Sequence, residues 1–320
     1  MNRPETSVKQ SRSINFSEKA RLLVDNMANA LVGQSQSSKL AVVAMLAGGH
    51  VLLEDVPGVG KTLLAKSLAS SIRADFKRIQ STPDLLPSDI SGVQIYDQRE
   101  SKFKFVMGPI FTNILLMDEI NRATPRTQSS LLEAMEEKQV TSDGITRELP
   151  PLFFVIATQN PIEHHGTFPL PEAQLDRFMI SMSLGYPNRE DEKEIAKKTL
   201  GRNAFSVSSV LTVEDVLEMR EEMLNIFVHE ALINYVIDIV TASREHPSIV
   251  LGVSPRGTQL LIKASQALAY VEGREFVSPE DIKLLAPYVF GHRVVPKIKS
   301  NKVCHSDLIK KVLENVKVPS

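Results

Sequence analysis

Short apolar runs alternate with helical apolar patterns over the first half of the chain. Each run has the length of one strand, and between the runs apolar residues recur every three or four positions, as in amphipathic helices. We assign strands to the run that follows His50 and to the runs at 114–119, 153–157 and 179–183, and a further strand to the alternating pattern at 76–80. Strands and helices that alternate in this way are typical of a parallel sheet covered by helices on both faces. The pattern therefore predicts an α/β domain.

Period-two patterns stop near 185–188, and helix caps take over. Thr212 with Asp215 forms a capping-box pattern, and Ser254 and Ser278 each precede a proline at a first helical turn. We therefore expect a helical domain at 188–320 after an α/β domain at 18–187. Residues 1–17 are polar, and we expect them to form a flexible tail.

Two segments of the α/β region predict structure outside the sheet. Residues 82–104 are interrupted by Pro, Asp and Gly, which predicts an excursion containing a short strand at 92–96. Residues 139–147 predict a β-hairpin that turns at Asp143–Gly144, because an Asp-Gly pair suits the tight turn between two strands.

Composition limits the partners and the compartment. The formal net charge of the 320 residues is −1, which argues against a protein that coats nucleic acid. The single Cys304 excludes an internal disulfide framework and fits a reducing compartment. The longest apolar stretch, at 40–47, is too short for a membrane span, and residues 1–17 lack the apolar core of a signal peptide. We expect a cytoplasmic protein.

A Pro/Gly-rich loop joins the first predicted strand to the following helix and ends in Gly-Lys-Thr. Backbone N–H groups in such a loop, with the positive end of the helix, can surround phosphate oxygens. The lysine reaches the β- and γ-phosphates, and the threonine hydroxyl can ligate Mg²⁺. Asp55 stands where the general pattern begins with glycine. The residues expected to bind the nucleotide are Pro57, Gly58, Val59, Gly60, Lys61, Thr62 and Leu63.

Two adjacent acids, Asp118 and Glu119, end the apolar strand at 114–119. Ligands gather beyond the carboxyl ends of parallel strands, so these carboxylates lie where a phosphate–Mg²⁺ cluster would bind. The alternative is a solvated strand end, which the nearby phosphate loop disfavours.

The chain resembles the MoxR group of AAA+ ATPases from about Val32 onward. The resemblance implies a P-loop NTPase fold, with a five-stranded parallel sheet flanked by helices and a smaller all-α lid. It also implies Mg²⁺-dependent ATP hydrolysis in a homo-oligomeric, hexameric ring, and chaperone-like remodelling of clients alongside von Willebrand factor A-domain proteins. The segments that carry it are 57–62, 116–123, 131–137, 157–161 and 170–178.

The resemblance also assigns roles to single residues. Asp118 would hold Mg²⁺ through water, and Glu119 would polarise the attacking water. Asn160 resembles the first sensor residue, with an ordinary Asn-Pro turn as the alternative. Arg177 resembles the arginine finger that reaches a neighbouring subunit's nucleotide. Its alternative is a surface ion pair with Asp176.

Arg256 has an argument of its own. It falls in the first turn of a predicted helix, where a cation opposes the helix dipole, so its position suggests an anionic neighbour. The second sensor of this ATPase class occupies a similar helix, and a solvated arginine is the alternative. Arg122 follows the acidic pair and could sense a neighbouring nucleotide or form a structural ion pair; both readings stay open.

Three other functions share these motifs. A nucleotide-dependent switch would hydrolyse slowly and assemble or release a partner. A nucleic-acid motor shares the fold class, but the near-neutral charge makes nucleic acid an unlikely partner. A motor subunit related to metal chelatases is closer in pattern and stays open.

Overall fold

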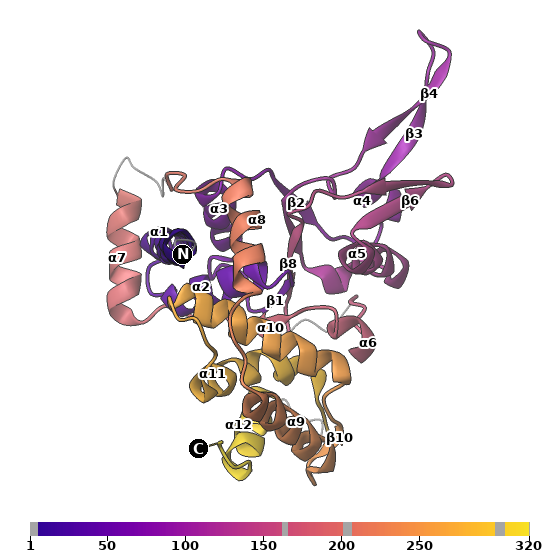
Figure 1. Cartoon of the computed structure of the whole chain (residues 1–320). Coiled ribbons are helices and arrows are strands. Elements are labelled where there is room, and N and C mark those ends of the chain that lie inside the picture. Colours follow the sequence, from indigo (N-terminus) through magenta and orange to yellow (C-terminus); the bar gives the residue numbers. More distant parts are fainter. Residues whose placement is uncertain (1–5, 162–165, 201–206, 298–304, 320) are drawn as a thin grey trace.

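Five parallel strands form the central sheet, in the order β2-β5-β8-β1-β9 (Figure 1). The computed structural model describes residues 6–161, 166–200, 207–297 and 305–319. The sheet confirms the predicted α/β fold, and β1, which leads into the phosphate loop, lies between β8 and β9. The strands are β1 (Val51–Glu54), β2 (Phe76–Gln80), β5 (Ile114–Asp118), β8 (Phe154–Gln159) and β9 (Ile180–Met182).

Alternate residues of the strands enter two separate cores because successive side chains point to opposite faces of a sheet. In β1, Val51 and Leu53 share one core with residues of the first three helices and of C-terminal helices, whereas Leu52 shares the other with a fourth helix. The first three helices are α1 (Thr6–Ala30), α2 (Ser35–Leu46) and α3 (Lys61–Ser71), and the fourth is α5 (Pro125–Glu137). The sheet is therefore covered on both faces.

Two hairpins extend from the sheet domain on one side (Figure 1). The predicted strand at 92–96 is β3 (Gly92–Asp97), which follows the short helix α4 (Pro87–Ser91) and pairs with β4 (Lys102–Met107), a strand that was not predicted. The second hairpin, β6 (Gln139–Ser142) with β7 (Ile145–Glu148), confirms the prediction. Its turn residues Asp143 and Gly144 both have positive φ, as a tight two-residue turn requires.

Helices dominate the C-terminal half. One correction concerns its class, because two short strands, β10 (Ile249–Leu251) and β11 (Val295–Pro296), pair antiparallel in a region predicted to be all-α. Over the described residues, none of the helices combines the length and apolar character needed to cross a bilayer. The remaining elements are η1 (Ile120–Arg122), α6 (Glu172–Leu175), α7 (Arg189–Leu200), α8 (Val213–Met223), α9 (Glu230–Glu245), α10 (Pro255–Val271), α11 (Pro279–Phe290), η2 (Gly291–Arg293) and α12 (His305–Asn315).

The predicted flexible tail at 1–17 is wrong for residues 6–17, because helix α1 begins at Thr6. Residues 1–5 lie outside the described residues. The apolar stripe that marks this helix in the sequence begins only at Ala20, so nothing in the pattern indicated its first turns.

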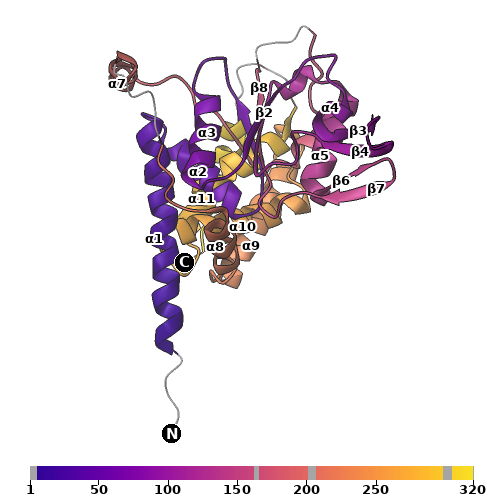
Figure 2. The same ribbon diagram turned by 90° about the horizontal axis from the view of Figure 1, so that it is seen from above.

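Helix α7 lies beside α1 in both views (Figures 1 and 2), and Lys198 Nζ donates to the Asn29 carbonyl over 3.2 Å. The domain boundary at 187 stays a prediction.

Candidate functional site

The predicted phosphate loop joins β1 to α3, as the motif requires. Gly58 and Gly60 have φ values of 86° and 101°, a region that favours glycine, and Gly60 is the N-cap of α3. Lys61 is buried at the start of the helix, and its Nζ donates to the carbonyl oxygen of Asp55 over 3.0 Å. The first-turn N–H groups of α3, including those of Thr62 and Leu63, lack carbonyl partners within the helix, which makes this end suited to an anion.

Asp55, which stands where the general loop pattern has glycine, is buried, and its side chain takes part in hydrogen bonds. Its carboxylate accepts hydrogen bonds from Ser183 Oγ at 2.6 Å, Leu184 N at 2.6 Å and Gly185 N at 3.1 Å. These three residues follow β9. The carboxylate thus ties the first turn of the phosphate loop to the chain that leaves the sheet.

Asp118 and Glu119 end β5 as predicted. Asp118 Oδ1 accepts from Thr158 Oγ1 at 2.7 Å, and the same hydroxyl oxygen accepts from the Glu119 N–H at 2.9 Å. Glu119 has a left-handed backbone (φ 54°, ψ 50°), which is uncommon for a residue other than glycine and occurs often at functional sites. One hydroxyl therefore fixes both acids against β8.

Two polar residues of β2 contact these acids and were missed in the sequence. Arg78 donates to Asp118 Oδ2 from Nε at 3.2 Å and from Nη2 at 2.7 Å, and Gln80 Nε2 donates to Glu119 Oε2 at 2.7 Å. The strand register places Gln80 opposite Asp118. Gln80 ends the strand, which was a signal in the sequence, but Arg78 lies in its middle, and the contacts of both residues required knowing that β2 pairs with β5.

Arg122 and Asn160 complete the description of this edge. Arg122 Nε lies 3.1 Å from Glu119 Oε2, so the structural ion pair proposed for it is present. Asn160 is buried and directly follows β8, which is the strand next to β5 in the sheet. Its role as a sensor stays a prediction.

The two remaining predicted residues, Arg177 and Arg256, lie together elsewhere. Both contact Glu136 near the end of α5: Arg256 Nη1 lies 2.5 Å from Oε1, and Arg177 Nε lies 3.3 Å from Oε2. The hydrogen bond from Arg256 and the nearby charge of Arg177 lower the pKa of Glu136, although burial acts in the opposite direction. Glu136 is the anionic neighbour suggested by the position of Arg256. Glu136 was not predicted from the sequence, because its position in the pattern is that of an ordinary exposed acid on a helix.

This arginine pair lies at the amino edge of the sheet, whereas the phosphate loop lies at the carboxyl edge. His50, which directly precedes β1, contacts the carbonyl of Met135 through Nε2 at 3.3 Å. The carbonyl of His50 accepts from Met179 N at 2.9 Å, two residues after Arg177. The four residues of β1 span about 13 Å between the two edges. One chain therefore presents a phosphate loop with acids on one edge and two arginines on the other.

The alternative for Arg177, an ion pair with Asp176, is not what forms. Asp176 Oδ1 instead accepts from Arg293 Nε at 2.7 Å. Arg177 instead forms its ion pair with Glu136, and 29% of its side chain is exposed.

A family model described as ATPase family associated with various cellular activities (AAA) matches residues 50–180, and a model of the AAA lid domain matches residues 241–312. The protein named Chaperone MoxR1 of Mycobacterium tuberculosis is 42% identical over 300 residues, which cover 90% of this chain and 79% of that protein. The chain belongs to the MoxR family of AAA+ ATPases. Protein YeaC of Bacillus subtilis is 46% identical over 92% of this chain and 93% of its own length.

Solved structures support the fold of this MoxR-family chain. The crystal structure of a candidate ATPase from Cytophaga hutchinsonii superposes with a TM-score of 0.90 at 38% identity, and 98% of each chain is covered. Within the MoxR-family chain, the AAA match contains every carboxyl-edge residue and Arg177, and the lid match contains Arg256.

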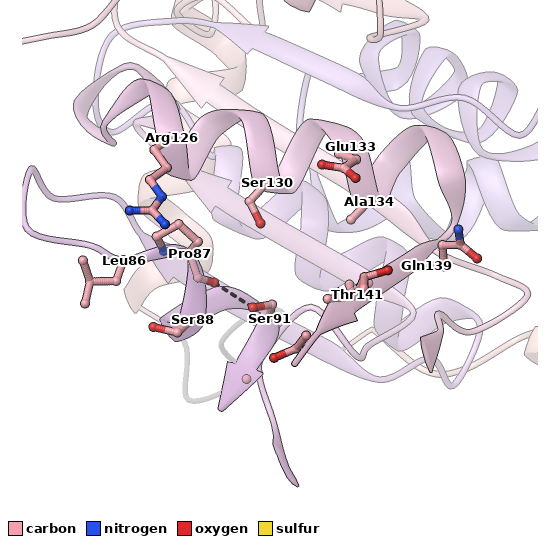
Figure 3. Close-up of a pocket in the computed structure, with 13 residues that line it drawn as sticks. Leu86, Pro87, Ser88, Ser91, Arg126, Ser130, Glu133, Ala134, Gln139 and Thr141 are labelled. Carbon is pink, nitrogen blue, oxygen red and sulfur yellow. Dashed lines mark hydrogen bonds between the residues drawn. The ribbon is translucent and has the colours of Figure 1, made fainter. Parts of the chain in front are cut away.

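The MoxR-family chain also has a pocket of about 390 Å³ (Figure 3). It is bordered by α4, α5 and β6, and Arg126 and Glu133 of α5 are among its charged residues. None of the predicted site residues lines it. The pocket is therefore separate from the phosphate loop.

Proposed function

We propose that the chain binds ATP with Mg²⁺ at the carboxyl edge and hydrolyses it when the arginines of a neighbouring copy complete the site. One observation carries this proposal: Lys61 and Asp118 lie at one edge of the sheet, whereas Arg177 and Arg256 lie together at the other. A contact that joins two different surfaces of identical chains repeats head to tail and closes into a ring when the rotation allows. We infer a hexameric ring from the family resemblance.

The donor set fits Mg²⁺, which prefers carboxylate, hydroxyl and phosphate oxygens. Thr62 and Asp118 would hold the ion, which would offset the negative charge of the phosphates. Lys61 and the N–H groups of the loop would bind the phosphate oxygens. Glu119 would orient and polarise the attacking water, with Asn160 as a second polar group beside it. The arginines from the neighbouring copy would stabilise charge that develops in the transition state.

Glu136 would hold the arginine pair until the neighbouring nucleotide takes it over. A triphosphate carries more negative charge than one carboxylate, and arginine binds both through the same forked donors. The two arginines are about a third exposed, at 29% and 38% of their side chains, so they can reach a partner. Arg256 would thus act on the neighbour's nucleotide rather than on its own.

We infer protein clients for the ring. The name of the mycobacterial relative, Chaperone MoxR1, supports this class. Partnership with von Willebrand factor A-domain proteins stays a prediction of the family resemblance, as does remodelling as the outcome of turnover.

The experiment that tests the proposal mixes two inactive variants. Arg177→Ala subunits keep a complete nucleotide site, and Glu119→Gln subunits keep both arginines. An equal mixture should recover about a quarter of the wild-type turnover, because about a quarter of randomly formed interfaces join an intact site to intact arginines. Arg126→Ala, which removes an exposed arginine of α5, is the control and should turn over ATP alone at the wild-type rate. Absence of any gain on mixing contradicts shared sites.

A further inference from the structure

Asp176, directly before Arg177, contacts two parts of the C-terminal region at once. Its carboxylate accepts from Arg293 Nε at 2.7 Å, and its backbone carbonyl accepts from Arg293 Nη2 at 2.9 Å. Ser254 Oγ lies 3.2 Å and 3.4 Å from the two carboxylate oxygens. Asp176 therefore joins the segment that carries Arg177 to η2 and to the start of α10.

Arg293 is the most enclosed member of this group, with 2% of its side chain exposed. Its Nη2 also donates to the carbonyl of Phe178 at 2.6 Å, and its Nη1 donates to Met179 at 3.3 Å and to Val289. Burial lowers the pKa of Arg293 to about 10, so the guanidinium stays charged at neutral pH. A buried charge needs its partner, and the only anionic group among these contacts is Asp176.

Ser254 connects the same carboxylate to Arg256. It is the N-cap of α10, and its Oγ accepts from the Gly257 N–H at 3.3 Å. A Cβ at Gly257 would lie 2.4 Å from Val253 Cγ1 and 3.3 Å from Arg293 Cδ, so the absent side chain lets the first turn of α10 approach the guanidinium. Arg256 lies between Ser254 and Gly257 in this tightly held turn.

We propose that Asp176 and Arg293 are positioning residues that hold Arg177 and Arg256 at the spacing needed to engage a neighbouring copy's nucleotide. The inference rests on the proposed function. It adds a physical link between the α/β region and the lid, in which one ion pair with a buried guanidinium fixes both arginines although they come from different matched regions of the chain. Neither residue touches the nucleotide of its own chain, whose loop lies at the opposite edge.

The first test is Asp176→Asn in the full chain. We expect kcat for ATP to fall about 10–100-fold, because small misplacement of a transition-state group has effects of that size, while KM for ATP stays within twofold. The matched control is Asp281→Asn. Asp281 is an acid that forms an ion pair with Arg274 at 2.5 Å and lies in the same lid, but it has no contact with Arg177 or Arg256 in the structure described. It should keep the wild-type kcat.

Mixing separates positioning from general damage. Asp176→Asn subunits keep their own nucleotide site, so an equal mixture with Glu119→Gln subunits should recover about a quarter of the wild-type turnover. No recovery, under conditions in which Arg177→Ala with Glu119→Gln does recover, overturns the positioning role and leaves the proposed function intact. If neither mixture recovers, the shared site itself fails and the positioning role fails with it.

A milder variant decides the matter if Asp176→Asn does not fold. Ser254→Ala removes only the hydroxyl between Asp176 and α10, and Thr212→Ala removes a comparable N-cap hydroxyl from α8, where Thr212 Oγ1 accepts from Asp215 N at 3.3 Å. We expect Ser254→Ala to lower kcat about threefold to tenfold, and Thr212→Ala to leave it unchanged. Equal kcat values for the two variants overturn the proposal.

Discussion

At the carboxyl edge of the sheet, the predicted side chains belong to motifs that are continuous along the sequence, whereas the amino edge joins residues 136, 177 and 256, which are far apart along it. The first group includes Lys61 at the end of a loop and Asp118 at the end of a strand. The second meets only through the fold, at one carboxylate. The comparison teaches that a local motif reveals the half of the site that we propose to bind the nucleotide, while the half that we propose a neighbour to supply is spread over the chain.

The largest effect should come from the amino edge. Arg177→Ala removes a charge that would act only on the transition state, so we expect ATP turnover to fall by about 10³–10⁵ while ATP affinity stays within about twofold. Steady-state phosphate release and calorimetric titration with ATP measure the two quantities. Arg126→Ala is the matched arginine control. A loss of ATP affinity in Arg177→Ala would place the arginine in its own chain's site and break the comparison.

The carboxyl edge should respond next. Glu119→Gln keeps the shape of the side chain but removes the base, and we expect turnover to fall about 10²–10⁴-fold with ATP binding retained. Glu133→Gln, which changes an exposed acid of α5, should turn over normally. Full activity of Glu119→Gln in the same phosphate-release assay would remove Glu119 from the mechanism.

Stability should depend on pH through the amino edge. Burial, together with the nearby cations Arg220, Lys138 and Arg256, lowers the pKa of His50 from 6.5 to about 4. The ring accepts a hydrogen bond from the Val155 N–H at 3.0 Å. The unfolded chain binds the proton at higher pH, so stability is lost as pH falls from 6.5 to 4, by about 3 kcal/mol. Burial also lowers the pKa of His292, which adds to the loss in the same direction.

Denaturant unfolding at pH 7 and pH 4.5 tests this assignment. His50→Asn keeps an acceptor for the Val155 N–H and cannot be protonated, so its loss of stability between these pH values should be smaller than that of the wild type. His229→Asn, at an exposed position, should retain the wild-type dependence. An identical pH dependence for His50→Asn and the wild type would exclude His50 as the cause.

The smallest effect sharpens the comparison within the carboxyl edge. Gln80→Ala removes the exposed hydrogen bond to Glu119, which contributes about 0.5–1.5 kcal/mol, so kcat should fall by at most about tenfold with ATP affinity unchanged. Gln94→Ala, on β3, removes an amide outside the site and is the control. A fall as large as that of Glu119→Gln would mean that the amide takes part in the chemistry itself.

The sequence predicted the carboxyl edge because β1, β5 and β8 are buried apolar strands and the predicted functional residues lie at or directly after their ends. Arg78 and Glu136 could not be predicted in the same way. Arg78 contacts Asp118 only because β2 and β5 are neighbours in the sheet, and Glu136 lies between two arginines that the fold brings together. The strand β4 and the first turns of α1 were missed for a different reason, since neither segment carries an apolar pattern that requires a buried face.

Asp55 has a practical consequence for protein engineering. Consensus design often stabilises proteins by restoring the residue most frequent in a motif, and here it would replace Asp55 by glycine. That exchange would delete the acceptor of three hydrogen bonds from the chain that follows β9. A substitution that looks like a repair of the loop would therefore loosen the exit from the sheet, and libraries built on this scaffold should keep aspartate at position 55.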